Sequence, residues 1–523
     1  MSSGPAGESV TARASGQPPR ARPRRPRGGG RRAIGSAVAG LLLAGCAVGP
    51  NFSRPTASAV AGYTQEPVSL PPPGGADPEQ RFVIETAVAR QWWELFRSRQ
   101  LNETIALALT GSPTLASARA TLSQAEAVVA QARGIYYPQL DLGGTANRTY
   151  TRTTTDASAG KASTTTDTTI NVFSFGPLLT YAPDVFGHNR RFVEQQAALA
   201  ENQRYQLAAA YLSLAAGAVT QAVTIASTRA QIKAAEQVIA TDEHNLELVR
   251  IAFEAGTVAM TDVLLARSQL ASDLTLLPPL RQQLSVARHA LTVLVGTTPA
   301  EWSPPDFDLE ALVLPAELPV VLPSELIHQR PDILAAEAQL HAASAAIGVA
   351  TAQLYPSVTL SAAWTFERTV RGGAGLIDTS SLITDLAAGI LAPLFHGGAL
   401  EAQRRAAIAA FEAQLATYRQ VVLQAFGQVA DALRALQHDA ELLRAEIEAV
   451  TTSEASLKLA QDAYAAGRGS LLQVLDAQRL YQQALLGYTR AKAQRYLDTI
   501  QLFQVMGGAG QDWLRQEASA PAS

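Results

Sequence analysis

The sequence lacks most of what a catalytic or disulfide-stabilised protein needs. Its 523 residues include a single cysteine, Cys46, so no disulfide bond can form within one chain. The 7 histidines are scattered without a metal-ligand spacing such as His-Glu-x-x-His, and no phosphate-binding loop is present. We therefore expect neither an enzyme nor a cofactor-binding or metal-binding protein, and any energy for its work must come from a partner.

Long apolar runs are also missing. The clearest run, residues 33–45, has the length of a signal-peptide core and is too short to cross a bilayer as a helix. Eight arginines and one glutamate lie within residues 1–45, which gives this segment a charge of +7; because the whole chain carries −3, the remainder carries −10. The basic head is typical of an export signal, and the acidic remainder argues against nucleic-acid binding. If such a chain spans a membrane, it must do so with β-strands.

The apolar run ends in Leu43-Ala44-Gly45-Cys46, which resembles a bacterial lipobox. The resemblance implies cleavage before Cys46 and attachment of lipid to this residue. The residue after Cys46 is Ala47 and not the aspartate that retains lipoproteins at the inner membrane. We therefore expect an outer-membrane location. The alternative is a free cysteine that follows a short apolar run by chance.

A ladder of apolar residues with a seven-residue period occurs twice, and its two copies lie 211 residues apart. The first copy runs from Tyr211 to Phe253 and the second from Val422 to Tyr464. A sustained heptad is typical of long helices that pack side by side with a left-handed supercoil. The pattern predicts long helices over 188–254 and 398–465, each ended by a glycine (Gly256 and Gly467), followed by returning helices from about 262 and 471. Pro278-Pro279 predicts a break in the first returning helix.

Before each long helix, the period changes from helical to two. Residues 357–367 alternate between an apolar set, which includes Trp364 and Phe366, and a polar set, which includes Thr365 and Glu367. Residues 139–151 show a weaker alternation, and return strands are expected over 168–180 and 382–391. One apolar and one polar face suit a barrel wall between lipid and water. Half-burial in a soluble sheet is the alternative for any single strand.

These elements require more than one copy of the chain. Four strands cannot close a pore, and an open sheet edge is not tolerated in lipid, so the strands must join those of other copies. The predicted fold class is therefore mixed α and β: a long α-helical coiled-coil tunnel together with an outer-membrane β-barrel, built from an internal duplication.

Several motifs, in this order, resemble the outer-membrane efflux proteins. They include Trp92-Trp93-Glu-Leu-Phe96, Arg330-Pro331-Asp332, and the segment Gly467-Arg-Gly-Ser-Leu-Leu-Gln-Val-Leu-Asp-Ala-Gln478. The similarity is to the TolC-like lipoprotein branch that serves resistance-nodulation-division (RND) pumps. It implies a homotrimer with a twelve-stranded barrel and a helical periplasmic tunnel. It also implies partners, namely a periplasmic adaptor, an inner-membrane RND pump and outer-membrane lipid.

The resemblance also assigns roles at the two helix tips. Leu472 and Asp476 match the positions that constrict the periplasmic aperture, as an apolar ring and a ring of carboxylates. A helix-tip network and adaptor docking surface would include Gly256, Asp262, Gly467, Ser470 and Gln473. The residues alone leave other interpretations open. Ser470 and Gln473 fit a capping box, Asp476 fits a solvated helix residue, and Asp262 fits either an N-cap or an ion pair that closes the aperture.

The chain accordingly divides into five expected parts, listed here by residue number: signal peptide 1–45, lipid-anchored tether 46–91, first repeat 92–312, second repeat 313–513, and tail 514–523. The predicted function is passive export of small solutes through a trimeric outer-membrane channel of a tripartite RND-type efflux system. Two alternatives remain, the exit duct of a type I protein-secretion system and a coiled-coil structural lipoprotein that forms no channel. The amphipathic segment 357–367 opposes the second alternative, because a scaffold needs no such strand.

Overall fold

The computed structural model describes residues 47–56, 62–71, 80–84, 88–156, 162–372 and 377–508. Cys46, the signal segment and the expected tail therefore lie outside the described residues. Two similar halves follow one another along the described chain. The helices and strands of the first half are α2 (Arg99–Gly111), α3 (Pro113–Arg133), β2 (Gln139–Thr155), β3 (Thr164–Tyr181), α4 (His188–Glu254), α5 (Met260–Leu274) and α6 (Leu277–Val295). Those of the second are α7 (Pro323–Gln329), α8 (Pro331–Ala352), β5 (Ser357–Gly372), β6 (Ile377–Leu391), α9 (Ala399–Ala465) and α10 (Leu471–Val505).

The helices α4 and α9 confirm the predicted long helices. Each has 67 residues, about 100 Å of α-helix. Each is preceded by a glycine with a positive φ, 82° at Gly187 and 80° at Gly398, a backbone conformation that glycine adopts readily. The expected break is also present, because α5 ends at Leu274 and α6 begins at Leu277, just before the two prolines.

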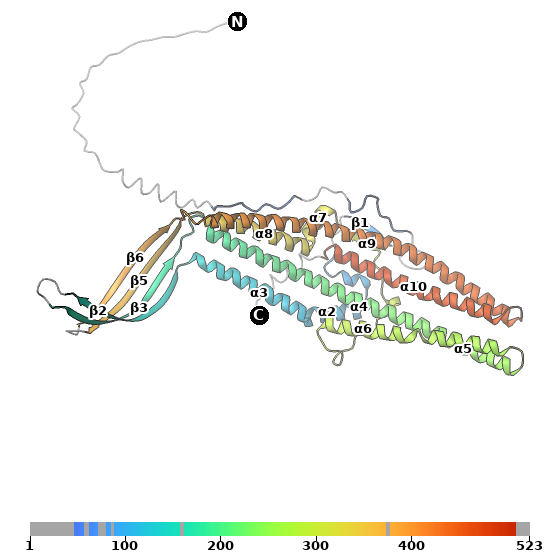
Figure 1. Cartoon of the computed structure of the whole chain (residues 1–523). Helices are drawn as coiled ribbons and strands as arrows, with labels where there is room; N and C mark the ends of the chain where they lie inside the picture. The colour runs from blue at the N-terminus through green and yellow to red at the C-terminus, as the bar shows by residue number, and fades with distance from the viewer. Residues whose placement is uncertain are drawn as a thin grey trace, which may run out of the picture. The chain divides into compact units, whose positions relative to one another are not determined.

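The heptad ladder forms the helical core in the middle of both long helices. Ala218 and Ile225 on α4, and Val429 and Leu436 on α9, are at most 1% exposed. Toward the tip of α4 the ladder residues become more exposed to solvent, and Phe253 is 40% exposed. In Figure 1 the helices α4, α9 and α10 run side by side, with the sheet at one end and the α4–α5 and α9–α10 turns at the other.

The four long strands form one antiparallel sheet in the order β2-β3-β5-β6. All four predicted strands are confirmed, and each extends several residues further toward the loops than expected. The two halves meet where β3 pairs with β5, for example Phe175 with Phe366. The strands β2 and β6 are therefore the sheet edges, and neither has a partner on its outer side in the described chain.

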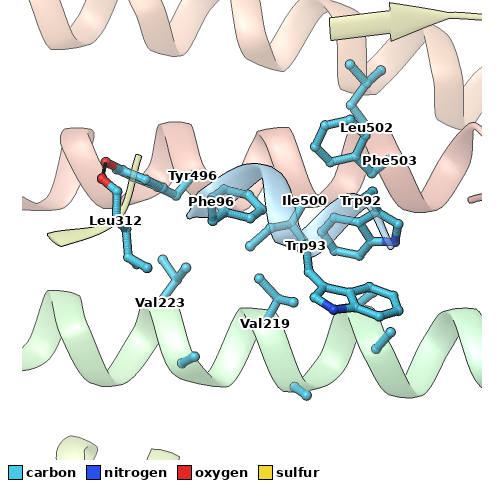
Figure 2. Close-up of a cluster of buried hydrophobic side chains, with 14 of the residues drawn as sticks. Trp92, Trp93, Phe96, Val219, Val223, Leu312, Tyr496, Ile500, Leu502 and Phe503 are labelled. Carbon is cyan, nitrogen blue, oxygen red and sulfur yellow. Dashed lines mark hydrogen bonds between the residues drawn. The ribbon is translucent and has the colours of Figure 1, made fainter. Parts of the chain in front are cut away.

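A dense aromatic cluster lies where the helices of the two halves meet (Figure 2). Trp92, Trp93 and Phe96 of the 3-10 helix η1 (Trp92–Phe96) are 0–4% exposed. They fill the space between α4, which contributes Val219 and Val223, and α10, which contributes residues such as Phe503, whose ring centroid is 5.2 Å from that of Trp92. Burial of such large rings contributes much of the packing free energy of a domain.

The stretch expected to be an extended tether is partly docked. Residues of β1 (Arg81–Ile84) pair in parallel with β4 (Glu317–Val320), which the sequence pattern did not reveal. Gln80 is 4% exposed and donates through Nε2 to the carbonyl of Pro315 at 3.0 Å. Segments that precede the first repeat are thus bound to residues of the second repeat.

Ser112 and Pro113 connect α2 to α3. Ser112 occupies the N-cap position of α3 with extended backbone angles, and Pro113 begins the helix. However, the Ser112 side chain makes no capping hydrogen bond. Its N–H instead donates to the carbonyl of Ala108 at the end of α2, so the two helices are nearly continuous and the serine joins them.

Candidate functional site

The first helix tip, between α4 and α5, is a tight glycine-dependent turn. Gly256 has a φ of 76°, and its N–H donates to the carbonyl of Phe253 at 2.9 Å. Asp262 lies in the first turn of α5, and its Oδ2 accepts the N–H of Ala259 at 3.2 Å. Asp262 is therefore not the N-cap residue of α5, which is Ala259; it stands at the third helical position, from which its carboxylate satisfies the N-cap backbone N–H.

The second tip, between α9 and α10, has the same construction. Gly467 has a φ of 70°, and its N–H donates to the carbonyl of Tyr464 at 2.9 Å. Ser470 Oγ accepts the N–H of Gln473 at 3.3 Å, and Gln473 Oε1 accepts the N–H of Ser470 at 3.1 Å. This reciprocal pair is a capping box, so Ser470 and Gln473 fix the start of α10.

The start of α10 presents two different faces. Leu471 and Leu475 are buried against Val249 of α4 and hold the tip of α10 to the first helix pair. Leu472 is 61% exposed, and the exposed side chain of Asp476 follows one helical turn later. Asp476 Oδ1 accepts from Arg479 Nη2 at 2.7 Å. The two predicted gate residues therefore lie on the same exposed side of α10, and the proposed ring requires other copies of the chain.

The segment directly after the lipidation candidate is docked on the helices rather than free. Val48 N–H donates to the carbonyl of Phe186 at 3.2 Å. Arg191 of α4, which is 4% exposed, donates to the carbonyls of Val48 and Gly49 at 3.3 and 3.4 Å and to Asn51 Oδ1 at 2.7 Å. We call residues 47–54 the N-terminal strap.

Close backbone packing and charge fix the N-terminal strap further. A Cβ added at Gly49 would lie 2.5 Å from Gly348 Cα, so no larger residue fits between the strap and α8. Arg54 pairs with Glu337 at 2.7 Å, and the Phe52 ring stacks on His341 with centroids 4.5 Å apart. The strap thus holds Ala47, the neighbour of Cys46, close to Gly187, where β3 leads into α4.

The carboxylate of Glu194 contacts two of the residues that bind the N-terminal strap. Burial opposes ionisation of Glu194, but hydrogen bonds from His341 and Arg191 outweigh it and lower the pKa of its carboxyl. Glu194 Oε1 lies 3.0 Å from His341 Nε2, and its Oε2 lies 2.7 Å from Arg191 Nη1. The ionised form orients both residues that contact the strap.

The sheet separates its side chains into two faces, as the alternation predicted. Paired residues such as Phe175, Phe366 and Leu382 lie in one row on one face. The adjacent row on the other face contains Thr145, Ser174, Glu367 and Ser381. The apolar face is widely exposed in the single chain, with Leu382 at 59% and Leu386 at 80%. An exposed apolar band of this kind marks a surface that contacts lipid or other protein.

Charged pairs mark the loop end of the sheet. Arg368 pairs bidentately with Asp378 at 2.6 and 3.1 Å, and Arg152 pairs with Asp167 at 2.8 and 3.0 Å. They lie on the same face as the apolar band, directly beyond it. On β5 the band runs from Val358 to Phe366, close to the roughly 9–11 residues that a tilted membrane strand needs.

No candidate metal centre accompanies these features in the described part of the chain. Nowhere among those residues do three or more histidine, cysteine, aspartate or glutamate side chains gather so as to hold a metal ion. Two described helices, α4 and α8, are long and apolar enough to cross a membrane by length and composition alone, but 61% of the relevant window is buried in each. That burial is typical of core helices.

Comparisons with known proteins agree on one family. The family described as outer membrane efflux protein matches residues 104–297 and 322–508, which correspond to the two halves of the fold. The pyoverdine export outer membrane protein OpmQ of Pseudomonas aeruginosa is 30% identical over 424 residues, which cover 81% of this chain and 88% of that protein. The toluene efflux pump outer membrane protein TtgF of Pseudomonas putida is 30% identical over 482 residues, 90% of this chain and 95% of that protein.

Solved structures show the same architecture. The outer-membrane channel OprN superposes with a TM-score of 0.76 at 26% identity, and the match covers 89% of this chain and 100% of that one. The predicted resemblance and the predicted fold class are both confirmed by these matches.

Proposed function

The chain belongs to the outer membrane efflux protein family, and on that premise we propose that three copies assemble into one continuous exit duct. As a family member it is an outer-membrane component of an efflux system, and its sheet and long helices have the fold of an outer-membrane channel. The family consists of transporter components rather than known enzymes.

The observation that carries the trimer is the sheet with its two unpaired edges. In lipid, every N–H and C=O along the outer sides of β2 and β6 needs a partner. Three copies of a four-stranded sheet would supply 12 strands, an even number within the range of known barrels. The apolar band would then face lipid, and the row that contains Thr145 and Glu367 would face the aqueous lumen.

The duct would be anchored by lipid at Cys46 and constricted at its helix tips. The N-terminal strap supports the first point, because it holds residue 47 next to the membrane end of α4. The exposed pair Leu472 and Asp476 on α10 supports the second, since three copies would bring these side chains around one axis. A periplasmic adaptor would dock between the tips by helix-in-groove packing, and an RND pump would deliver the solute.

Relatives indicate the class of cargo. OpmQ is named for pyoverdine export and TtgF for toluene efflux, which are both small solutes. We infer that this chain exports small solutes rather than proteins, with selection made upstream in the pump. Deletion of the gene should increase sensitivity to small toxic compounds at least several-fold, and a pull-down of the tagged protein should recover an adaptor and a pump of the RND type. Recovery of a protein-secretion ATPase instead would favour the secretion duct.

The lipid anchor has its own test. Cys46→Ser should abolish metabolic labelling with a fatty acid while the protein is still made. Labelling that persists in this variant would discard the lipobox interpretation.

A further inference from the structure

A buried polar cluster joins α10 to the first pair of long helices. It consists of Asp242 and Asn245 from α4, Asp273 from α5, and Gln478 and Gln482 from α10. Both aspartates and both glutamines are 2–5% exposed. We call these five residues the three-helix cluster. The burial of the four aspartate and glutamine side chains is achieved within one chain and does not depend on the assembly of further copies.

Hydrogen bonds run from the amides of α10 to the carboxyl groups of the first helix pair. Gln478 Nε2 donates to Asp242 Oδ1, and Gln478 Oε1 accepts from Asn245 Nδ2 at 3.0 Å. Gln482 Nε2 donates to Asp273 Oδ1 at 3.0 Å. The other oxygen of Asp273 accepts from Gln269 Nε2 at 2.9 Å, within α5.

One carboxyl oxygen is left without a partner. Asp242 Oδ2 is fully buried and accepts no hydrogen bond from any described residue. Its neighbour is the Asp273 carboxyl, which lies within hydrogen-bonding reach. If both carboxyl groups were ionised, they would repel each other. One proton shared between them would give Asp242 Oδ2 a hydrogen-bond partner and remove the repulsion.

Among the described residues, neither carboxyl group forms an ion pair, and no cation contributes to the pKa shift of Asp242. The helix α5 contributes Asp273, and α10 contributes only amides. The arginines that follow along the packed helices pair elsewhere: Arg479 of α10 with Asp476, Arg281 of α6 with Glu236, and Arg250 of α4 with Glu254. Burial, followed by the hydrogen bond and the charge of Asp273, raises the pKa of Asp242 to about 8, and the Gln478 amide opposes this in part.

We propose that the three-helix cluster is a proton-controlled latch, which holds α10 against the α4–α5 pair while Asp242 and Asp273 share a proton and releases it when that proton is lost. The inference rests on the proposed channel function, because α10 also carries the gate residues. Gln478 follows Asp476 by two positions, so movement of α10 at the cluster would be transmitted directly to the aperture.

The direction of the effect follows from the charges. At acidic and neutral pH the shared proton is present, and the cluster carries one negative charge. As the pH rises through about 8, the proton leaves and two desolvated negative charges face each other. Separation of α10 from α4 and α5 admits water and relieves that cost, so alkaline pH favours the open aperture.

A second buried pair has similar chemistry but joins different helices. Asp498 of α10 is 2% exposed and has an unpartnered Oδ2, and its neighbour is Asp439 of α9. Both residues belong to the same helix pair, so its titration cannot separate α10 from α4 and α5. Of these two buried carboxyl pairs, the one formed by Asp242 and Asp273 lies between α10 and the α4–α5 pair.

Single-channel recording of the full-length protein in planar bilayers tests the latch. Between about pH 6 and about pH 10 the wild type should show a several-fold rise in conductance or open probability, with a midpoint near pH 8. Asp273→Asn keeps the shape of the side chain but leaves at most one charge in the cluster, so this rise should be lost. Glu243→Gln, next to Asp242 on the exposed side of α4, makes the same change of charge and should keep the wild-type profile.

Each outcome separates the two proposals. A wild-type midpoint and amplitude in Asp273→Asn would overturn the latch. Current that is the same at every pH in the wild type would also overturn it, while leaving the channel intact. The absence of any current from folded, lipidated wild-type protein would overturn the channel function itself.

Infrared titration provides a readout that does not depend on conduction. It is best done in an Asp498→Asn background, so that the second buried pair does not contribute. A protonated carboxyl band should be present at neutral pH, disappear as the pH rises through about 8, and be missing when Asp242→Asn is added. A background protein without that band at neutral pH would contradict the shared proton.

Discussion

At the scale of single residues, the same side chain types have different roles according to what packs around them. Asp262 caps a helix, Asp476 pairs with Arg479 at an exposed position, and Asp242 is buried beside a second carboxyl. Asp242 is costly to ionise, because burial removes the water that would solvate the charge. Position in the fold, and not residue type, therefore decides which aspartates respond to pH.

Asp476→Ala is expected to widen the resting aperture. An exposed i,i+3 pair contributes less than about 1 kcal/mol, so loss of the bond to Arg479 should barely affect stability. Loss of a ring of carboxylates should instead raise the single-channel conductance and weaken cation selectivity. Asp462→Ala, at the exposed end of α9, is the matched control and should conduct as the wild type does. Equal conductance in both variants would remove Asp476 from the gate.

The pair Asp439 and Asp498 predicts a pH dependence of stability. Burial, with the hydrogen bond and charge of Asp439, raises the pKa of Asp498 to about 8 from an ordinary value of 3.8. Between these values the unfolded chain ionises and the folded protein does not, so the stability of the fold falls as the pH rises. Asp498→Asn should make that slope shallower by about 1.4 kcal/mol per pH unit. Melting temperatures of the detergent-solubilised protein at several pH values would show it, and parallel curves for variant and wild type would contradict it.

The residue scale also shows where sequence analysis stopped. The capping box at Ser470 and Gln473 could be predicted, because all its partners lie within four positions. The three-helix cluster could not, since its aspartates stand 31 positions apart in the chain and their amide partners more than 200 further on. In α4 alone, Asp242 resembles an ordinary solvated helix residue.

At the scale of elements, local pattern determined most of the outcome. The heptad together with the flanking glycines predicted α4 and α9 almost to the residue. The two-residue alternation located β2 and β5, and the expected return strands are β3 and β6. Pairing of β3 with β5 and of β1 with β4 was not predicted, because strand order depends on contacts between distant segments. The N-terminal strap was missed for the same reason: it lies in a Pro-rich stretch whose composition is typical of a linker, and its docking depends on distant residues such as Arg191 and Gly348.

Two equivalent glycines test the strap. Gly187→Ala and Gly398→Ala should each cost about 1–2 kcal/mol for a positive φ. A Cβ at Gly398 would meet no atom within 4 Å, whereas one at Gly187 would lie 2.7 Å from Ala47 Cα. We therefore expect Gly187→Ala to be the more harmful, with a lower melting temperature and faster protease cleavage near residue 50. Equal effects in the two variants would indicate that the strap is not docked there.

Opposite faces of β6 provide the test of the membrane-facing band. Leu386 is 80% exposed in the single chain, so a soluble sheet would tolerate Leu386→Arg. At mid-depth on a lipid-facing surface, the same change should cost about 2–4 kcal/mol and reduce the yield of folded protein in the outer membrane. Ala387→Arg, on the opposite face of the strand, should fold at the wild-type level. Normal membrane yield of Leu386→Arg would assign this face to water or to protein.

At the scale of the whole molecule, one geometric requirement connects these features. The described chain supplies a sheet with one apolar face and two open edges, attached to helices about 100 Å long. A single copy can neither enclose a lumen nor satisfy its edge strands in lipid. Family membership places the protein in the outer membrane, and the proposed closure by further copies would turn the sheet into a barrel wall and the helices into a tunnel.

The most direct measurement is therefore made on the purified, lipidated protein: its mass in detergent together with the current that it conducts across a planar lipid bilayer. We predict a heat-resistant trimer and discrete single-channel steps, which Leu386→Arg reduces in number without changing their size. A monomer in detergent that never produces a current step in the bilayer would contradict the account.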